Sequence, residues 1–126
     1  MRCAEVSRRT GETDINISLD LDGQGTSNLD TGMGFFEHML NLFTTHGQFN
    51  LKVECSGDLF VDGHHSVEDI GIALGQAFTK AMGDKVGIKR YGTAFVPMDE
   101  ALIMVSLDLS GRAFLNYEVL VKAQMI

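Results

Sequence analysis

The stretch ETDINISLDLDG, residues 12–23, decides how the chain is organised because a close copy of it returns later. Residues 100–111, EALIMVSLDLSG, carry the same glutamate, serine, leucines, aspartate and glycine at an offset of 88 positions. In the first stretch apolar and polar residues alternate strictly, which is typical of a strand with one buried face. Two amphipathic strands can also converge by chance, so this alternative to a duplicated unit stays open.

A duplicated unit of 88 residues would divide the chain into two parts. Residues 1–88 would form a first α+β repeat, which contains all four histidines and the helix that follows two of them. Residues 89–126 would supply three strands that begin a second repeat. On this interpretation the chain stops partway through its own second half.

Hydrophobic spacing predicts the other elements. Apolar residues recur at helical intervals over residues 34–46 and 67–81, while residues 49–55 alternate as a second strand. Gly71 and Gly75 in the second helix would allow close packing against a sheet. Three further strands are predicted, over residues 92–97, 100–109 and 112–121. The predicted class is α+β, with a sheet backed by helices.

Composition limits the class of protein. The 126 residues are 44% hydrophobic and carry a formal net charge of −7, which is typical of a soluble domain and disfavours nucleic acid as a partner. The sequence has no apolar run near the ~18 residues of a membrane span, and its start lacks the apolar stretch of a signal peptide. Cys3 and Cys55 form no CxxC motif, so we expect free thiols and a cytoplasmic location.

The motif HHSVE, which starts at His64, places three metal-ligand side chains in five positions. Imidazole and carboxylate together suit Mn, Fe, Zn or Ni. Adjacent side chains diverge by about 100° on a helix, so His64 and His65 would serve two ions more easily than one. Glu68 reaches either ring if the helix includes both; alternatively, Ser66 and Asp69 form a capping box that leaves the histidines in the preceding loop. The other interpretation is a pair of surface histidines at a helix start.

Four other residues are candidates for a site, each with an ordinary structural alternative. His38 lies in the apolar helix FFEHMLNLF, where it is either a metal ligand or a core histidine bonded to a backbone carbonyl. His46 precedes a glycine at the helix end and suits the C-terminal dipole. Arg90 and Arg112 adjoin turns, where a guanidinium can hold a phosphate or simply be exposed.

Four longer motifs carry a resemblance to a known family. They are TGMGFFEHMLNLFTTHG (31–47), GDLFVDGHHSVEDIGIALGQAF (57–78), GDKVGIKRYGTAFVPMDEAL (83–102) and DLSGRAFL (108–115). Together they closely resemble imidazoleglycerol-phosphate dehydratase, a lyase of histidine biosynthesis, over about residues 5–120. The resemblance implies an α+β, duplicated half-domain fold of the ribosomal protein S5 domain 2-like type. It also implies homo-oligomers that assemble through trimers into a 24-mer with two Mn²⁺ ions per site.

The same resemblance implies a set of site residues. The implied metal ligands are His38, His64, His65 and Glu68, and Glu12 is implied to be an acid/base that contacts the substrate. His46 falls in the family's substrate-binding segment, and Arg90 and Arg112 fall at its phosphate-contacting positions. Two small departures are Gly63, where the family usually has Asp, and Ala113, where it usually has Pro. The family's second HHxxE motif does not occur in these 126 residues.

The implied reaction converts D-erythro-imidazoleglycerol phosphate to imidazole acetol phosphate by way of an enol. Metal ions that hold the substrate ring as an imidazolate would help it to expel the hydroxyl group, and Glu12 would transfer a proton. Two octahedral ions leave at least roughly six positions to protein ligands, and this chain brings four. We therefore expect the truncated, 126-residue form to be inactive or barely active, while it retains some metal affinity. The alternatives are a non-catalytic metal-binding or assembly module of the same fold and metal-assisted hydrolysis.

Overall fold

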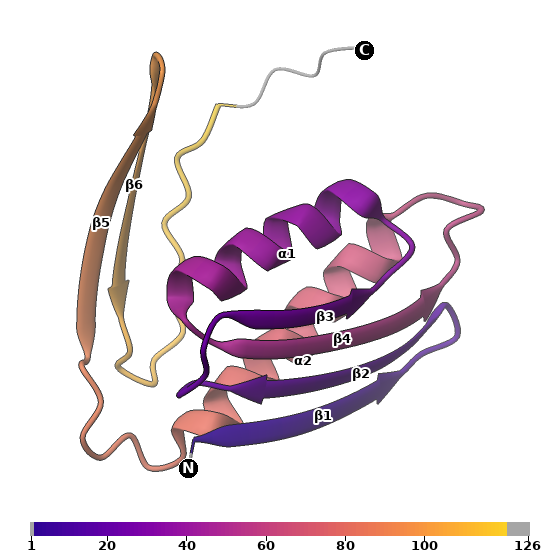
Figure 1. Ribbon diagram of the computed structural model, residues 1–126, viewed down its shortest axis with the longest axis horizontal. Helices are drawn as coiled ribbons and strands as arrows, with labels where there is room; N and C mark the ends of the chain where they lie inside the picture. The colour runs from indigo at the N-terminus through magenta and orange to yellow at the C-terminus, as the bar shows by residue number, and fades with distance from the viewer. Residues whose placement is uncertain (1, 121–126) are drawn as a thin grey trace. The chain divides into compact units, whose positions relative to one another are not determined.

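The computed structural model describes residues 2–120 and divides the chain into two compact units, Met1–Val86 and Gly87–Ile126. In the described residues, the first unit contains a sheet and two helices, and the second contains one hairpin (Figure 1). The elements in chain order are β1 (Cys3–Arg9), β2 (Thr13–Asp20), β3 (Thr26–Asp30), α1 (Gly34–Gly47), β4 (Asn50–Gly57), α2 (His64–Met82), β5 (Tyr91–Met98) and β6 (Ala101–Asp108). The predicted α+β class is confirmed.

The four strands of the first unit form one sheet in the order β1-β2-β4-β3. Strand β2 pairs antiparallel with both β1 and β4, whereas β3 runs parallel to β4 because α1 connects them as a crossover. Figure 1 shows α2 crossing behind the sheet and α1 lying along β3. The opposite face of the sheet carries the polar residues of the alternating strands, such as Asn16 and Ser18 of β2 and Lys52 of β4.

The core lies between α2 and the centre of the sheet. Ile15, Ile17 and Leu19 of β2 are at most 2% exposed, and their partners on β4 include Leu51 and Val53. The helix contributes a stripe of mostly small residues at helical spacing, namely Ile70, Ala73, Ala77 and Ala81. Alanine side chains let the helix axis approach the strands closely, because they leave little volume between the two layers.

The prediction that Gly71 and Gly75 make this close approach is wrong. Both glycines are exposed, and a β-carbon built at either position would meet nothing within 4 Å. The alanines at 73 and 77 occupy the sheet-facing positions instead, two residues along from each glycine. Within the described residues, neither helix combines the length and the apolar character that crossing a membrane would require.

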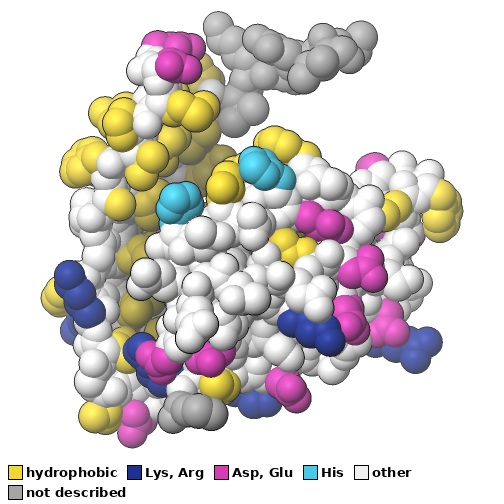
Figure 2. Space-filling view, in the orientation of Figure 1, with side chains coloured by type: hydrophobic (Ala, Val, Ile, Leu, Met, Phe, Trp, Pro, Cys, Tyr) yellow, Lys and Arg dark blue, Asp and Glu magenta, His cyan; other side chains and the backbone are white. Residues whose placement is uncertain are grey.

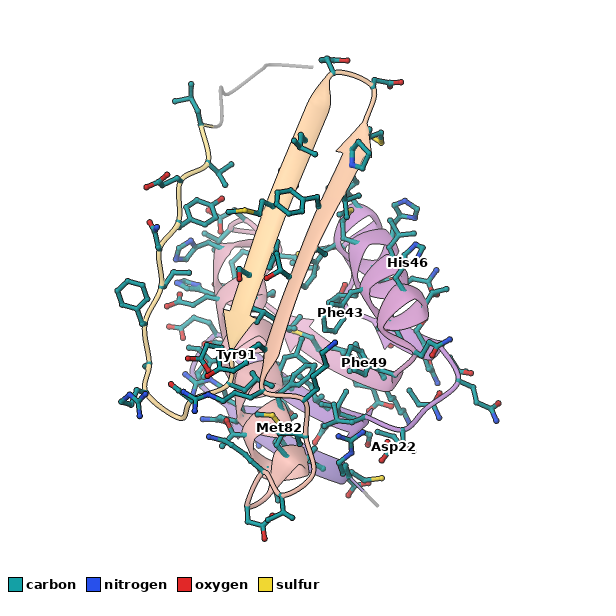
Figure 3. All side chains as sticks on the ribbon, turned by 90° about the vertical axis from the view of Figure 1, so that its left-hand side faces the viewer. Asp22, Phe43, His46, Phe49, Met82 and Tyr91 are labelled. Carbon is teal, nitrogen blue, oxygen red and sulfur yellow. The ribbon has the colours of Figure 1, made fainter. Side chains whose placement is uncertain are left out.

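Three aromatic rings close the core beside the end of α1. The ring centroids of Phe43 and Phe49 are 5.2 Å apart, and Phe78 of α2 lies 5.4 Å from Phe49 and 6.0 Å from Phe43. Edge-to-face and tilted contacts of this kind add to the stabilisation that burial of the rings gives. Figure 3 shows Phe43 and Phe49 adjacent to each other between α1 and the sheet.

The strongly periodic segments are the ones that the sequence predicts correctly. The predicted strand over residues 13–21, the helix over 34–46 and the strand over 49–55 correspond to β2, α1 and β4. The sequence does not predict strands β1 and β3, because neither has a long run of alternating apolar and polar residues. In β3, TSNLD, Leu29 is the one aliphatic side chain that packs against the core. Their pairing with central strands overrides this weak local preference.

The prediction of a strand over residues 112–121 is wrong for the residues that the structure describes. Residues 112–120 follow β6 without regular secondary structure, and residue 121 lies outside the described residues. A strand needs a neighbour that satisfies its backbone groups. In the described part of the second unit β6 pairs with β5, and nothing pairs with its other edge.

The hairpin β5–β6 repeats the hairpin β1–β2 at an offset of 88 residues. Cys3 pairs with Asp20 at the open end of the first hairpin, and Tyr91 pairs with Asp108 in the second. The bounds of β2 shifted by 88 are those of β6, and the start of β1 shifted by 88 is that of β5. Every residue of β5 and β6 is exposed, and Figure 2 shows hydrophobic side chains gathered over this hairpin.

Candidate functional site

The predicted ligands of the HHSVE motif lie on the first turn of α2. The helix begins at His64, and the N–H of Val67 donates to the carbonyl of Gly63 (3.0 Å), so both histidines are helical. The alternative of a capping box formed by Ser66 and Asp69 is therefore wrong. The Ser66 hydroxyl is instead buried beside Gly57 of β4.

The two histidines each have a carboxylate neighbour, and the two neighbours differ. His64 Nε2 lies 3.3 Å from Glu68 Oε2, one helical turn further on. His65 Nδ1 lies 2.7 Å from Asp58 Oδ2, in the loop between β4 and α2. The two rings are nearly perpendicular, with an interplanar angle of 75° and centroids 5.5 Å apart. Each imidazole therefore pairs with a different carboxylate, so the site contains two separate pairs of potential metal ligands.

The hydrogen bond with Asp58 is the main cause that raises the pKa of His65. Partial burial opposes this shift, while the negative charges of Glu12 and Asp62 add to it. In the neutral ring, a proton on Nδ1 that is held by Asp58 leaves Nε2 free to bind a ligand. The other oxygen of this carboxylate, Asp58 Oδ1, is buried and has no hydrogen-bond partner among residues 2–120.

Sequence reasoning missed Asp58 and Asp62 as parts of this site. Asp58 precedes His65 by seven residues, and Asp62 Oδ1 accepts the backbone N–H of His64 at 2.9 Å. The sequence signal was the acidic content of the loop GDLFVDG, but spacing within a loop gives no geometry. Only the folded loop shows that one carboxylate contacts the ring and the other the helix start.

Glu12 lies in the turn between β1 and β2, which packs against the first turns of α2. Thr10 holds this turn: its hydroxyl accepts the N–H of Glu12 (3.2 Å) and lies 3.3 Å from the carboxylate of Glu12. Asp69 of α2 contacts the same turn through Thr13, at 2.6 Å. The charge of Glu12 acts on His65, so this acid and the imidazoles share one end of the sheet.

His38 and His46 lie on α1, and both are exposed. The alternative in which His38 is a core histidine is therefore wrong. The loop before α1 lies close to the start of α2. A β-carbon built on Gly63 would lie only 3.0 Å from Met33 Sδ. His46 is in the last turn of α1, where Figure 3 shows it at the helix surface; this position also suits the helix dipole.

These residues do not form a complete coordination sphere as they stand. Among the described residues, no three His, Cys, Asp or Glu side chains converge closely enough to hold an ion. The convergent groups are pairs, His64 with Glu68 and His65 with Asp58. A bound ion would thus need rotamer changes or donors from another source in addition to these pairs.

The two predicted phosphate contacts lie in the second unit, near one carboxylate. Arg90 donates to both oxygens of Asp108, from Nε at 2.7 Å and from Nη2 at 3.3 Å, and its guanidinium lies 5.1 Å from the ring centroid of Tyr91. The hydrogen bond from Arg90 lowers the pKa of Asp108, and the charge of Arg112 lowers it further. Both arginines therefore act on the same carboxylate at the open end of the hairpin, Arg90 by direct hydrogen bonds and Arg112 through its charge.

The comparison with protein families decides which family this arrangement belongs to. Residues 31–126 match the family model described as imidazoleglycerol-phosphate dehydratase. The chain belongs to this family. An imidazoleglycerol-phosphate dehydratase from Acetivibrio thermocellus is 58% identical over 122 residues, and one from Caldanaerobacter subterraneus subsp. tengcongensis is 59% identical over 126 residues.

The similarity extends along nearly all of the chain but not along all of these relatives. The alignments cover 97% and 100% of this chain and span 63% and 65% of the lengths of the two relatives. Among solved structures, the Staphylococcus aureus N315 dehydratase superposes with a TM-score of 0.84 at 39% identity, covering 98% of this chain and 67% of the other. The Pyrococcus furiosus dehydratase gives 0.72 at 34% identity, with coverages of 93% and 61%.

Proposed function

We propose that this chain is part of a hydro-lyase that dehydrates imidazoleglycerol phosphate to imidazole acetol phosphate in cytoplasmic histidine biosynthesis. The observation that carries the proposal is the junction of α2 with the β1–β2 turn. There two imidazoles, each beside a carboxylate, share one end of the sheet with Glu12. Membership of the dehydratase family supports this reaction rather than another that the same side chains could catalyse.

The donors at this junction fit a divalent metal, which we propose to be Mn²⁺. Oxygen and imidazole donors suit this ion, and the hydrogen bond from His65 to Asp58 would orient the ring with Nε2 free. The other proposed ligands are His64, Glu68 and His38. Two such ions per site would act as Lewis acids that stabilise negative charge on the substrate.

The remaining site residues have proposed roles in binding and proton transfer. Glu12 is proposed to move a proton to or from the substrate, since its carboxylate is exposed on a turn that is itself held in place. His46 is proposed to contact the substrate. Arg90 and Arg112 are proposed to bind its phosphate, for which Arg90 would exchange the carboxylate of Asp108 for the phosphate, since a guanidinium can bind either group through two parallel hydrogen bonds.

The number of ligands limits what one chain can do. Four proposed ligands are fewer than the roughly six that two octahedral ions leave to protein. We therefore propose that the isolated 126-residue chain has little or no dehydratase activity. Complete sites would need further donors, with self-association through trimers to a 24-mer as the proposed assembly.

Metal binding provides the first test. Mn²⁺ titrated into the purified chain, followed by electron paramagnetic resonance of the free ion, is expected to show uptake. Asp58→Asn should weaken it by about 10- to 100-fold, because it removes the carboxylate that orients the His65 ring, and His65→Ala should weaken it at least as much. Asp22→Asn, at the opposite end of the β1–β2 pair, is the control. Absence of uptake in the unaltered chain would overturn the metal site.

The reaction itself provides the second test. Mass spectrometry of imidazoleglycerol phosphate incubated with Mn²⁺ and an assembled dehydratase that contains these residues should show the dehydrated ketone, with loss of turnover in Glu12→Gln. Release of inorganic phosphate would favour metal-assisted hydrolysis instead. Metal binding without either product would favour the non-catalytic module. Substantial dehydration by the isolated chain would contradict its proposed inactivity.

A further inference from the structure

A buried carboxylate next to the proposed ligands has no part in the function proposed above. Asp69 follows Glu68 in the chain, but its side chain lies in the contact between α2 and the β1–β2 turn. The residue is only 7% exposed. A buried carboxylate is costly unless donors surround it, so its partners indicate what holds it there.

The partners of Asp69 come from three residues around the β1–β2 turn. Arg8 donates to Oδ1 from Nε at 3.3 Å, and its Nη2 forms an ion pair with the same oxygen, also at 3.3 Å. Thr13 donates to Oδ2 at 2.6 Å, and the hydroxyl of Thr10 lies 3.4 Å from the same oxygen. The hydrogen bond from Thr13, followed by the nearby charge of Arg8, lowers the pKa of Asp69 against the effect of burial.

The carboxylate fixes the direction of a chain of hydroxyl groups. Because an ionised Asp69 can only accept, Thr13 must use its single hydroxyl proton toward Oδ2. The oxygen of Thr13 then accepts from Thr10, whose hydroxyl lies 2.9 Å away. Three acceptors lie near the Thr10 hydroxyl: Thr13 at 2.9 Å, the Glu12 carboxylate at 3.3 Å and Asp69 Oδ2 at 3.4 Å. The shortest contact takes the proton, so Thr10 donates to Thr13 and both of its lone pairs remain to accept.

Those two lone pairs are filled by the backbone of the turn. The N–H of Glu12 donates to Thr10 Oγ1 at 3.2 Å, and the N–H of Thr13 donates to the same atom at 3.0 Å. The N–H of Thr10 donates to the carbonyl of Thr13 at 2.8 Å and closes the turn. Thr10 can accept both of these N–H groups only while its own proton is donated to Thr13. This in turn requires an acceptor, Asp69, for the proton of Thr13.

We propose that Asp69 is a positioning residue, which orders the Thr10 and Thr13 hydroxyls so that the turn holds Glu12 toward the histidines of α2. The part of this inference that concerns catalysis rests on the proposed function of Glu12. The part that concerns the turn does not, because it follows from the hydrogen bonds alone. Asp69 acts through Thr13 and Thr10, without itself contacting the substrate.

The substitution Asp69→Asn has a defined consequence. Arg8 can only donate, so the amide oxygen of the asparagine will face Arg8 and its NH₂ group will face Thr13. The NH₂ group donates where the carboxylate accepted, which reverses the hydroxyl chain. Thr10 then accepts from Thr13 and loses one of its two bonds to the turn. Adding Arg8→Met frees the amide to turn its oxygen back to Thr13 and should restore the original direction.

Amide hydrogen exchange measured by NMR tests the inference independently of activity. Asp69→Asn should speed exchange at the N–H of Glu12 about tenfold relative to the N–H of Ile17 in β2. The double variant with Arg8→Met should restore the wild-type ratio of the two exchange rates. The control Asp22→Asn should leave this ratio unchanged. An unchanged ratio in Asp69→Asn overturns the inference, as does a rise that the double variant fails to reverse.

Kinetics of the Mn²⁺-loaded assembled enzyme distinguish this inference from the proposed function. Asp69→Asn should lower kcat by about 10- to 100-fold, with KM and Mn²⁺ affinity unchanged, because a misplaced acid/base affects the chemical step. Thr13→Ser keeps the hydroxyl and should retain kcat, whereas Thr13→Val keeps the shape and should lose it. A changed exchange ratio at Glu12 with unchanged kcat supports the positioning role and refutes the catalytic role of Glu12.

Discussion

The two hairpins β1–β2 and β5–β6 share a pairing register but differ in burial, because alternate residues of β2 are buried whereas every residue of β5 and β6 is exposed. Leu19 of β2 is 2% exposed, while Leu107, at the same place in the repeated stretch, is 56% exposed. The difference is that α2 packs against β1 and β2 in the first unit. The comparison teaches that alternation and turn length determine strand pairing locally, whereas burial depends on which helix packs against the strand.

The turns of the two hairpins differ in the same way. The turn that carries Glu12 is held from outside the hairpin by Asp69 of α2, which accepts a hydrogen bond from Thr13 at the start of β2. The turn at Asp99 and Glu100 contains a residue with a left-handed backbone, Asp99 at φ 50°, and both of its residues are exposed. A turn can therefore form from local backbone preference alone, but orienting a side chain on it requires contacts from elsewhere in the fold.

The largest expected difference between the hairpins comes from matched leucine truncations. Leu19→Ala should lower the free energy of unfolding by about 2–5 kcal/mol, because it removes a fully buried side chain and leaves a cavity. Leu107→Ala should change it by less than about 0.5 kcal/mol. Urea denaturation followed by circular dichroism measures both. Equal losses would show that the face of β6 is buried in solution.

Glycine substitutions give the next largest difference. A β-carbon on Gly57 would overlap Ser66 Oγ at the start of α2, so Gly57→Ala should cost about 1–3 kcal/mol. Gly92 of β5 has nothing within 4 Å, and alanine already stands at the corresponding place in β1, Ala4. Gly92→Ala should therefore be neutral or slightly stabilising. A thermal unfolding series of both variants tests the contrast, which fails if Gly57→Ala is harmless.

The acid sensitivity of the two units should differ as well. Asp69 and Asp108 both have a folded-state pKa below the ordinary value of 3.8, so each stabilises the fold above that pH and loses its contribution as pH falls through the lowered pKa. The effect should be larger for the buried Asp69 than for the half-exposed Asp108, which solvent screens. The dependence of the urea midpoint on pH, measured between pH 3 and pH 7, should become weaker in Asp69→Asn and hardly change in Asp108→Asn.

The smallest difference is expected for the exposed ion pairs. Arg2 pairs with Asp22 at 2.6 Å and Arg90 with Asp108 at 2.7 Å, and the two arginines are themselves 88 positions apart. Both pairs are exposed and screened, so Asp22→Asn and Asp108→Asn should each lower the urea midpoint slightly at low salt and not measurably at ~1 M salt. A salt-resistant loss in either variant would indicate a role beyond the ion pair.

The sequence predicts the parts of the fold in which one periodicity dominates. β2, α1, β4 and the body of α2 follow from spacing alone. The short, polar β3 could not be predicted, because its pairing with β4 compensates for its weak propensity. For His38 the local pattern misleads in the other direction, because its apolar neighbours suggest a core position. Its neighbours Phe35 and Met39 are apolar, yet they are 79% and 46% exposed, so local hydrophobicity did not indicate burial.

The contacts of the candidate site also fall into two kinds, those within one helix and those between separate elements. The contact between His64 and Glu68 follows from helical spacing, although the motif alone left His65 as an equally reachable partner. The contacts of His65 with Asp58 and of Asp69 with Thr13 join a loop or a strand to the helix. Such contacts depend on the packing of α2 against the sheet, which no single stretch of sequence encodes.

The shared register of the two hairpins has a consequence for how such a fold can change. Since positions 88 apart have equivalent backbone neighbours, a segment from one hairpin can be exchanged for the other without altering the hydrogen-bond ladder. Side chains could then diverge separately in the two copies while the main chain stayed constant. One copy could acquire a helix-supported acidic turn and the other a pair of cations, each starting from the same ancestral scaffold.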